Sequence, residues 1–475
     1  MERIISYGQG KLDWFFANYK RYLPALALLT VMVCTPFVFA SDGAEGHGAE
    51  AAMTFLWITI ILISAKVSSL VEKIGQPSVL GELVMGVILG NLFLLGLNFF
   101  EPIKHNEIIA FLSELGVVIL LFQIGLESDI GTMKKVGVKA LLVAIVGVVA
   151  PFVLGTYVVG PWLMPDLSQN AYLFLGAALT ATSVGITARV FKDLKKLQTK
   201  EAQIILGAAV IDDVLGLIIL AVVSALVTVG AVSLGMVSWI IAKAVLFLVG
   251  SIVVGQLFAK PISKIFSKIH TGVGMKFTLV ICFGLFFAFL AQKIGLAPII
   301  GAFAAGLILD PVHFQYFKDA KVIRDVRREL KEARPEIKEK IEKVIAPHAH
   351  RHLEDLIEPL GVFLVPIFFI LTGMSVKIET MFDTSILLVA FGITIVAFIG
   401  KLLAGAVAGK GVSKQIIGWG MVPRGEVGLI FAMIGKSLGV LSDELFSVIV
   451  IMVILTTLLP PIVLAVLLKK QEKKA

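Results

Sequence analysis

The chain contains little charge and almost no cysteine. Asp, Glu, Lys and Arg make up only 16% of its 475 residues, against roughly 25% in soluble globular domains. Its two cysteines, Cys34 and Cys282, both lie in apolar runs. This excludes the disulfide framework of a small secreted domain and a cysteine-rich metal site, so we expect both cysteines to serve in packing.

Hydrophobic residues, by contrast, make up 58% of the chain, and its mean hydropathy is +0.95. A long chain of this composition is typical of a polytopic membrane protein surrounded by lipid. The net charge of +8 does not indicate a nucleic-acid partner, because the basic residues fall in short loops between apolar segments rather than on one face.

The first 40 residues form a region of their own. Four basic residues occur within Met1–Arg21, and an apolar run over residues 23–40 ends in the small residue Ala40. This order is typical of a cleaved signal peptide, which we favour over an extra N-terminal helix. In either case we expect residues 41–50 to lie outside the cytoplasm.

About thirteen further apolar segments follow, and most are long enough to cross a hydrocarbon layer about 30 Å thick as a helix. They cover approximately residues 52–71, 79–97, 108–126, 138–160, 171–190, 202–228, 235–260, 275–292, 296–310, 356–375, 384–408, 413–435 and 441–468. The predicted fold class is an all-α polytopic membrane protein.

The charges of the loops predict the orientation of the chain. Lys and Arg gather near residues 189–200 and 260–268 and in the tail over 469–475, whereas the loops over 161–170 and 227–236 contain neither. Lys and Arg are enriched on the cytoplasmic side of membrane proteins. An odd number of crossings that starts outside therefore places the C-terminus in the cytoplasm.

Two pairs of segments resemble each other. Residues 74–90 match residues 294–310 at a constant offset, and a weaker pair aligns Gly125 with Gly373. The members of each pair cross the membrane in opposite directions in the predicted topology. Such inverted-topology repeats mark secondary transporters, whose binding site lies near the midplane where the halves meet. For either pair alone, a chance match of small residues is the alternative.

Two segments carry residues that interrupt a helix. These residues are Thr180, Thr182 and Ser183 in segment 171–190, and Pro423, Arg424, Gly425 and Glu426 in segment 413–435. We predict two discontinuous crossing helices, whose unwound main chain lines a cavity and whose half-helix dipoles face a bound ion. For the first group, ordinary hydrogen bonding of the hydroxyls to the preceding turn is the alternative.

Asp212 and Asp213 stand side by side about ten residues, hence about 15 Å, into the apolar segment 202–228. A charged side chain at this depth costs several kcal/mol unless it faces a cavity or a partner, so the pair is a candidate site, with a protonated pair that merely packs as the alternative. Adjacent carboxylates repel each other, so a monovalent cation and protons compete for one coupled group. The hard oxygen atoms suit Na⁺ or Li⁺ rather than a soft metal.

One further base, Lys401, lies inside segment 384–408. Its long side chain could extend to the cytoplasmic interface. It could equally form an ion pair with one of the aspartates, which would break when a cation binds. The sequence leaves both interpretations open.

Six stretches, in order, carry a resemblance to a known family. They are GELVMGVILG (81–90), LLFQIGLESD (120–129), ALTATSVGITARV (178–190), AAVIDDVLGL (208–217), PIFFILTGMSV (366–376) and PRGEVGLI (423–430). Together they resemble the monovalent cation:proton antiporters of the second family, within the sodium/hydrogen exchanger superfamily, over about residues 55–468.

The resemblance implies Na⁺(Li⁺)/H⁺ exchange by a homodimer in the bacterial inner membrane, with no cofactor and no enzyme activity; K⁺/H⁺ exchange is the alternative. It also implies thirteen helices in a dimerisation domain and a core domain that moves like an elevator. The dimerisation domain with its linker helix corresponds to residues 52–100 and 235–310, the core to residues 107–228 and 356–468, and the cytoplasmic tail to residues 469–475.

Site residues can be carried over one by one from the resemblance. The ion-binding residues that it implies are Asp213, Asp212, Thr180, Thr182 and Ser183, with Na⁺ at the two aspartates. The implied charge partners are Lys401, which the resemblance pairs with the first aspartate, Asp212, and Arg424 and Glu426. An aspartate pair with a lysine implies electrogenic exchange of about two protons for each Na⁺, which the membrane potential drives with about 2.3 kcal/mol per charge per 100 mV.

The chain departs from the family pattern in two places. We expect the charged stretch over residues 311–355 to be a solvated cytoplasmic loop, although His348, His350 and His352 could sense pH or bind a metal. No nucleotide-binding domain follows the last segment, so we expect a plain exchanger rather than a regulated K⁺ efflux system. A sodium-coupled symporter of organic solutes is a further alternative, but it would need a wider cavity than an aspartate pair requires.

Overall fold

The structure is a computed structural model, described for residues 47–74, 76–127, 137–229, 234–309, 352–379 and 383–472 and for isolated positions between 310 and 351. Over these ranges it contains helices and no strand, in agreement with the predicted fold class. The predicted signal peptide or extra helix over residues 1–40, and most of the predicted loop over 311–355, lie outside the described residues.

The α-helices are, in chain order, α3 (His47–Ser68), α4 (Ser78–Gly90), α5 (Glu107–Glu127), α7 (Gly137–Val153), α8 (Gly160–Leu163), α9 (Gln169–Thr180), α10 (Val184–Asp193), α11 (Lys200–Val229), α12 (Leu234–Ile269), α13 (Val273–Lys293), α14 (Pro298–Ile308), α17 (His352–Met374), α19 (Thr384–Ala406), α20 (Lys414–Met421), α21 (Glu426–Ser437) and α22 (Asp443–Glu472). Short 3-10 helices are η2 (Ser69–Ile74), η3 (Leu92–Leu95) and η4 (Asn98–His105), and one π-helical turn is η5 (Leu154–Val159).

Within the described residues, ten helical stretches are long and apolar enough to cross a bilayer, and α20 with α21 makes an eleventh if the bent pair counts as one span. Two shorter apolar helices, α4 and α14, stand where segments 79–97 and 296–310 are predicted. Every predicted segment therefore has a helical counterpart. The number of thirteen crossings is not confirmed, because these two helices have 13 and 11 residues and a crossing needs about 20.

The helix α4 ends at Gly90, earlier than predicted, because a buried Asn91 caps it. The Asn91 amide donates to the carbonyl oxygens of Val87 and Val376 at 2.7 and 2.8 Å, and its own oxygen accepts from the N–H of Ile378. One side chain thus satisfies a terminal carbonyl of α4 and ties this helix to the chain just after α17.

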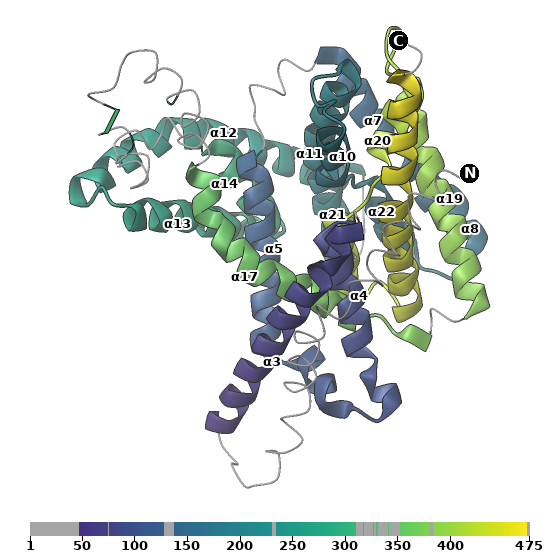
Figure 1. The fold of residues 1–475 in the computed structure, drawn as a ribbon, viewed down its shortest axis with the longest axis horizontal. Helices are drawn as coiled ribbons and strands as arrows, with labels where there is room; N and C mark the ends of the chain where they lie inside the picture. The colour runs from purple at the N-terminus through teal and green to yellow at the C-terminus, as the bar shows by residue number, and fades with distance from the viewer. Residues whose placement is uncertain are drawn as a thin grey trace. The chain divides into compact units, whose positions relative to one another are not determined.

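The chain groups into two compact units, each described by itself. The first comprises Met1–Ser113, Gly131–Val232 and Pro366–Ala475, and the second comprises Glu114–Ile130 and Ser233–Val365. In the first unit α19 and α22 run side by side (Figure 1), and α7 packs against both α11 and α19. The assignment of segments to a dimerisation domain and a core domain stays a prediction.

Small residues fill the contacts between these central helices. Ala144 on α7, Ala208 on α11 and Ala404 on α19 are fully buried in one cluster with Ile417 and Met421 of α20. Small side chains let helix backbones approach closely, which is how helices associate in a membrane. This cluster packs the helices that carry the predicted site against one another.

Glycines at two helix crossings match the internal repeat. The constant offset between the repeats makes Gly86 equivalent to Gly306, and the weaker pair makes Gly373 equivalent to Gly125. In the first unit, a Cβ atom on Gly86 would lie 2.9 Å from the Cα of Gly373. In the second unit, a Cβ atom on Gly125 would lie 3.1 Å from the Cα of Gly306. Equivalent glycines therefore make equivalent close contacts, as an inverted repeat requires.

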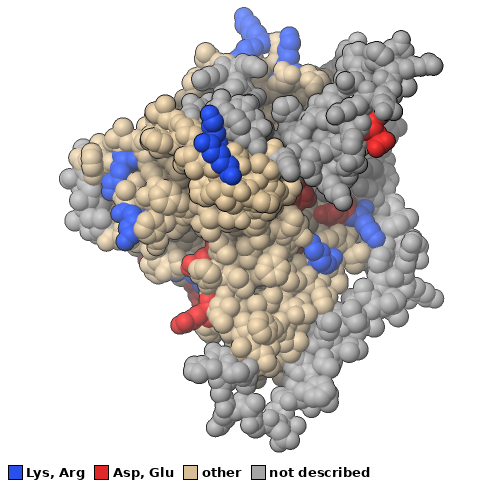
Figure 2. All heavy atoms as spheres, turned by 90° about the vertical axis from the view of Figure 1, so that its left-hand side faces the viewer, with Lys and Arg blue, Asp and Glu red and all other residues tan. Residues whose placement is uncertain are grey.

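Many large hydrophobic side chains lie on the described surface. Large hydrophobic side chains are exposed along the long helices, for example Val149 on α7, Leu246 on α12 and Phe391 on α19. On the face seen in Figure 2 the described atoms are mainly uncharged, with a few separate basic and acidic side chains. Long helices with exposed apolar side chains fit a lipid environment.

Candidate ion-binding site

Two helices are interrupted where the sequence predicts it. Because α9 ends at Thr180 and α10 begins at Val184, residues 181–183 form a first break. Residues 422–425 form a second break between α20 and α21, which are bent by 40°. Pro423 contributes to the second break, since it has no N–H to continue the helical hydrogen bonding. Both predicted discontinuous helices are present.

The two breaks are hydrogen-bonded to each other. The N–H of Ser183 donates to the carbonyl oxygen of Pro423 at 2.7 Å. The hydroxyls of Thr182 and Thr187 donate to the last two carbonyls of α20, at 3.3 and 2.7 Å. The last carbonyls of a helix have no partner within it, so these hydroxyls replace the hydrogen bonds that the second break removes.

Arg424 joins the two breaks from inside. Its side chain is fully buried, and it donates twice to the carbonyl of Leu179 near the end of α9, from Nε at 3.2 Å and from Nη2 at 2.8 Å. It also donates to the carbonyls of Val422 and Ala397, at 2.9 and 3.0 Å. A guanidinium group has five donors and favours the negative ends of helix dipoles. Arg424 therefore serves the main chain of both interrupted segments.

Asp212 forms a buried ion pair halfway along α11. The Nζ atom of Lys401 lies 3.0 and 3.2 Å from the two carboxylate oxygens of Asp212, and the two side chains are 0% and 1% exposed. Just before the lysine, a Cβ atom on Gly400 would lie 2.8 Å from Pro151, so α19 passes close to α7 here. The side chain of Lys401 is directed into the protein. It forms the ion pair with Asp212 and does not extend to the cytoplasmic interface.

Asp213, the next residue, has no such partner. Its side chain is 8% exposed, and within the described residues it has no hydrogen bond or ion pair. The charged groups that act on it are Asp212, Glu426 and Lys401. Glu426, in the first turn of α21, accepts a hydrogen bond from the hydroxyl of Ser183 at 3.2 Å. Asp213 is therefore the unpaired acid of this buried group.

The predicted hydroxyl ligands differ in their hydrogen bonds. Thr180 donates to the carbonyl of Ala177 at 2.8 Å, which is the ordinary bond to the preceding turn considered above. Thr182 lies against Asp212 as well as α20. The structure therefore brings all the predicted site residues to one region of the first unit, while their role in binding an ion stays a prediction.

Two threonines of this region were missed by the sequence reasoning. Thr187 lies one turn after Ser183 and supports the end of α20. Thr457, a polar residue in the apolar helix α22, donates to the main-chain carbonyl of Arg424. A hydroxyl inside an apolar segment is a detectable signal, but neither partner can be identified before the fold is known.

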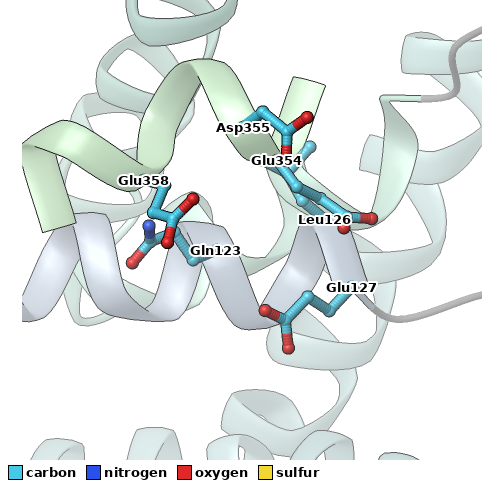
Figure 3. Close-up of a pocket in the computed structure, with 6 residues that line it drawn as sticks. All are labelled: Gln123, Leu126, Glu127, Glu354, Asp355 and Glu358. Atoms are coloured by element: carbon cyan, nitrogen blue, oxygen red, sulfur yellow. The ribbon is translucent and has the colours of Figure 1, made fainter. Parts of the chain in front are cut away.

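A separate acidic pocket of about 500 Å³ occurs in the second unit, between α5 and α17 (Figure 3). The residues that line it are Gln123, Leu126, Glu127, Glu354, Asp355 and Glu358. In the part of the chain that the structure describes, no three His, Cys, Asp or Glu side chains are arranged to hold a metal ion. The predicted alternative of a metal site at His348, His350 and His352 falls on side chains outside the described ones.

Known proteins resemble this chain over most of its length. The family described as "Sodium/hydrogen exchanger, transmembrane" matches residues 58–330 and 343–470. The high-affinity Na⁺/H⁺ antiporter NhaS3 of Synechocystis sp. is 35% identical over 435 residues, which cover 84% of this chain and 86% of that protein. The Na⁺/H⁺-K⁺ antiporter GerN of Bacillus cereus is 34% identical over 403 residues, which cover 83% of this chain and 91% of GerN.

A solved structure supports the fold. The sodium proton antiporter MjNhaP1 from Methanocaldococcus jannaschii matches with a TM-score of 0.60 at 17% identity, over 87% of this chain and 96% of that one. The matched residues of the family include both breaks and the aspartate pair. Its members are secondary transporters and not enzymes. The chain belongs to the sodium/hydrogen exchanger family of cation:proton antiporters.

Proposed function

We propose that the protein exchanges Na⁺ or Li⁺ for protons and that Asp213 binds the ion. The observation that carries this proposal is the charge balance of the site. With every group charged, and among the residues that the structure describes, Asp212, Asp213 and Glu426 face two basic groups, Lys401 and Arg424, which leaves one negative charge. An uncompensated charge inside a membrane protein costs several kcal/mol. One monovalent cation or one proton compensates it, so the two compete for Asp213.

The hydroxyls of the first break, together with the carboxylates, suit a small hard cation. Thr182 and Ser183 belong to the first break, and each hydroxyl keeps acceptor capacity after donating its one proton. Thr180 completes the predicted set through its free lone pairs. Arg424 is engaged with main-chain carbonyls, so it does not compete with the cation for Asp213.

The ion pair between Lys401 and Asp212 supplies the second proton in this proposal. A cation at Asp213 repels the ammonium group of Lys401 and attracts Asp212, which weakens the pair. The lysine then gives up its proton, so about two protons move for each Na⁺. The site loaded with Na⁺ is therefore one charge more negative than the protonated site, and the membrane potential acts on this charge difference with about 2.3 kcal/mol per charge per 100 mV. The exchange is electrogenic.

The setting of this exchange follows from the family resemblance and from the loop charges. We place the protein in a bacterial inner membrane, as a homodimer surrounded by lipid, with its C-terminus in the cytoplasm. An elevator-like movement of the core domain carries Asp213 from one side of the membrane to the other. The excess of Lys and Arg in the loops near 189–200 and 260–268 supports this orientation.

K⁺/H⁺ exchange is the second candidate function. GerN is named an antiporter of Na⁺, H⁺ and K⁺, so a relative of this chain combines both cations. K⁺ needs a larger shell of oxygen atoms than Na⁺, and the number of ligands that reach the ion decides between them. In this alternative the exchange is electroneutral, and Lys401 serves stability only.

Transport by the purified protein tests the proposal. The protein is placed in liposomes with a pH dye inside, and Na⁺, Li⁺ or K⁺ is added with the membrane potential clamped or free. We expect Na⁺ and Li⁺ to move protons, the rate to depend on the potential, and Asp213→Asn to abolish exchange while the variant stays folded. An Asn at 213 keeps the shape but carries no charge for a cation.

The matched control is Asp166→Asn, which changes an exposed aspartate outside the site and should transport as the wild type does. Exchange that survives Asp213→Asn would exclude this residue as the ion ligand. Equal rates with K⁺ and no effect of the potential would favour the electroneutral alternative, and no proton movement with any cation would reject exchange altogether.

A further inference from the structure

A second buried carboxyl group, that of Glu82, lies in the first unit but outside the site described above. It belongs to the apolar helix α4, and its side chain is 7% exposed. Within the described residues it has neither a hydrogen bond nor an ion pair. An acid in an apolar helix is costly when charged, and for that reason such residues usually serve a function.

The charged residues near Glu82 do not neutralise it by contact. Lys66 on α3 and Glu72 on η2 act on it from a distance, with opposite signs, and both are exposed. On η4, which also packs on α4, Lys104 pairs with Glu101 at 2.8 Å. The first-unit part of α17, from Pro366 to Met374, carries no charged residue. Glu82 is therefore left to bind a proton or a cation of its own.

The internal repeat provides a comparison for this position. The offset that aligns Gly86 with Gly306 aligns Glu82 with Ala302 on α14, and Ala302 is fully buried. Both short helices keep the same close glycine contacts. Since the equivalent helix packs with a methyl group here, the architecture does not require a carboxyl group at this place. Its presence in α4 calls for a chemical role.

Other polar atoms without a partner lie on the helices that pack on α4. Glu82 stands one helical turn before Gly86, on the face that approaches α17. The hydroxyl of Thr372 on α17 and that of Ser64 on α3 are buried and make no hydrogen bond, and α3 packs against α4. Buried polar atoms are normally paired with protein or with water. Both helices that neighbour α4 therefore also carry a buried hydroxyl without a partner among the described residues, as α4 carries a buried carboxyl group without one.

We propose that Glu82 is a second proton-binding site and that its protonation sets the pH dependence of exchange. It binds and releases a proton in place, independently of the ion at Asp213. The inference rests on the antiport proposed above, because the pH dependence is read from transport. The proton itself is also observable without transport.

Two variants and one control test this inference in the full-length protein. Glu82→Gln mimics the protonated group, Glu82→Ala introduces the residue of the equivalent repeat position, and Glu72→Gln removes a neighbouring exposed acid. We expect both Glu82 variants to exchange Na⁺ for protons, with the pH of half-maximal rate moved by about one pH unit. Glu72→Gln should move the profile less than either Glu82 variant, because it removes only a neighbouring charge.

Infrared difference spectra between about pH 6 and about pH 9, where exposed carboxyl groups stay ionised, supply the second readout. A carboxyl group that takes up a proton gives a carbonyl band, which we expect to be weaker in Glu82→Gln and unchanged in Glu72→Gln. Wild-type pH profiles and carbonyl bands in the Glu82 variants would overturn the inference, and so would failure of both variants to fold, since the group would then serve the fold. Exchange by Asp213→Asn would reject the proposed function alone, without changing the band of Glu82.

Discussion

The two breaks interrupt the main chain in the same way, but different chemistry stabilises each. The first break and its flanks offer hydroxyls, from Thr182, Ser183 and Thr187, which donate to the second segment or to its Glu426. The second break offers the guanidinium group of Arg424, which donates to the first segment and to its own. Each break supplies the donors that the other lacks.

Because their side chains differ, the two breaks serve different tasks: the second stabilises the main chain, and the first can bind the ion. A guanidinium group has no acceptor atom, whereas a hydroxyl keeps acceptor capacity after it donates. The second break therefore cannot provide side-chain ligands from Arg424, and the first break can provide them from its hydroxyls. In a membrane, main-chain groups freed by a break need internal partners. Arg424 meets that need, so the hydroxyl side stays available to a cation.

The largest effect is expected from Arg424→Met, which removes the donors that join the breaks. Three carbonyls lose their charged partner, and Asp212 loses a nearby positive charge. Removing one partner of a buried charged network costs about 3–5 kcal/mol of unfolding free energy. Thermal unfolding in detergent measures it, with Arg424→Lys as the control that keeps the charge but fewer donors. Unchanged stability would mean that Arg424 does not stabilise the main chain of the two breaks.

A smaller loss is expected from Gly425→Ala, which pushes the breaks apart. The new Cβ atom would lie 2.9 Å from the hydroxyl oxygen of Ser183, and relieving such an overlap costs about 1–3 kcal/mol. The Na⁺ concentration for half-maximal exchange should also rise, because Ser183 moves. Gly428→Ala is the matched control, since its Cβ would meet only ordinary contacts at 3.4 Å and beyond. Equal behaviour of both variants would show that the breaks need not touch.

Thr182→Val and Thr187→Val distinguish a hydroxyl that is proposed to bind the ion from a hydroxyl that only stabilises the end of α20. Each removes a hydroxyl that donates to a terminal carbonyl of α20, so each should lower the unfolding free energy by about 1 kcal/mol. Only Thr182 also lies against Asp212, so only Thr182→Val should weaken the apparent Na⁺ affinity. Proton movement at graded Na⁺ concentrations checks this. Weaker affinity in both variants would mean that packing of α20, rather than ligation, sets it.

The smallest effect is expected from Ser183→Ala. The lost hydrogen bond joins a hydroxyl to Glu426 at 3.2 Å, while the main-chain bond of the same residue to Pro423 stays. The unfolding free energy should fall by about 0.5 kcal/mol, the low end for one hydrogen bond, because this bond is long and the main-chain bond remains. Chemical denaturation measures this change. A loss of unfolding free energy as large as that of Arg424→Met would contradict the conclusion that the second break, through Arg424, contributes most to holding the two breaks together.

Most of the local features of the site could be predicted. Thr182, Ser183 and Pro423 mark interruptions of apolar segments, and the structure has breaks at these places. The sequence matches predicted an inverted repeat, and the equivalent glycines Gly86 and Gly125 make equivalent close contacts in the structure. The lengths of α4 and α14 could not be predicted, because capping residues such as Asn91 bond to distant parts of the chain.

The sequence by itself determined the helical class, the repeat, the aspartate pair and the positions of both breaks. These features depend on apolar length and on residues that interrupt a helix locally. The residues alone left the partner of Lys401 open and only the family resemblance implied it; the tertiary structure decided by packing that Lys401 pairs with Asp212 and leaves Asp213 unpaired. Neighbouring residues of a helix point about 100° apart, so the rotation of α11 and its packing against other helices select which aspartate meets the lysine. No local pattern contains that information.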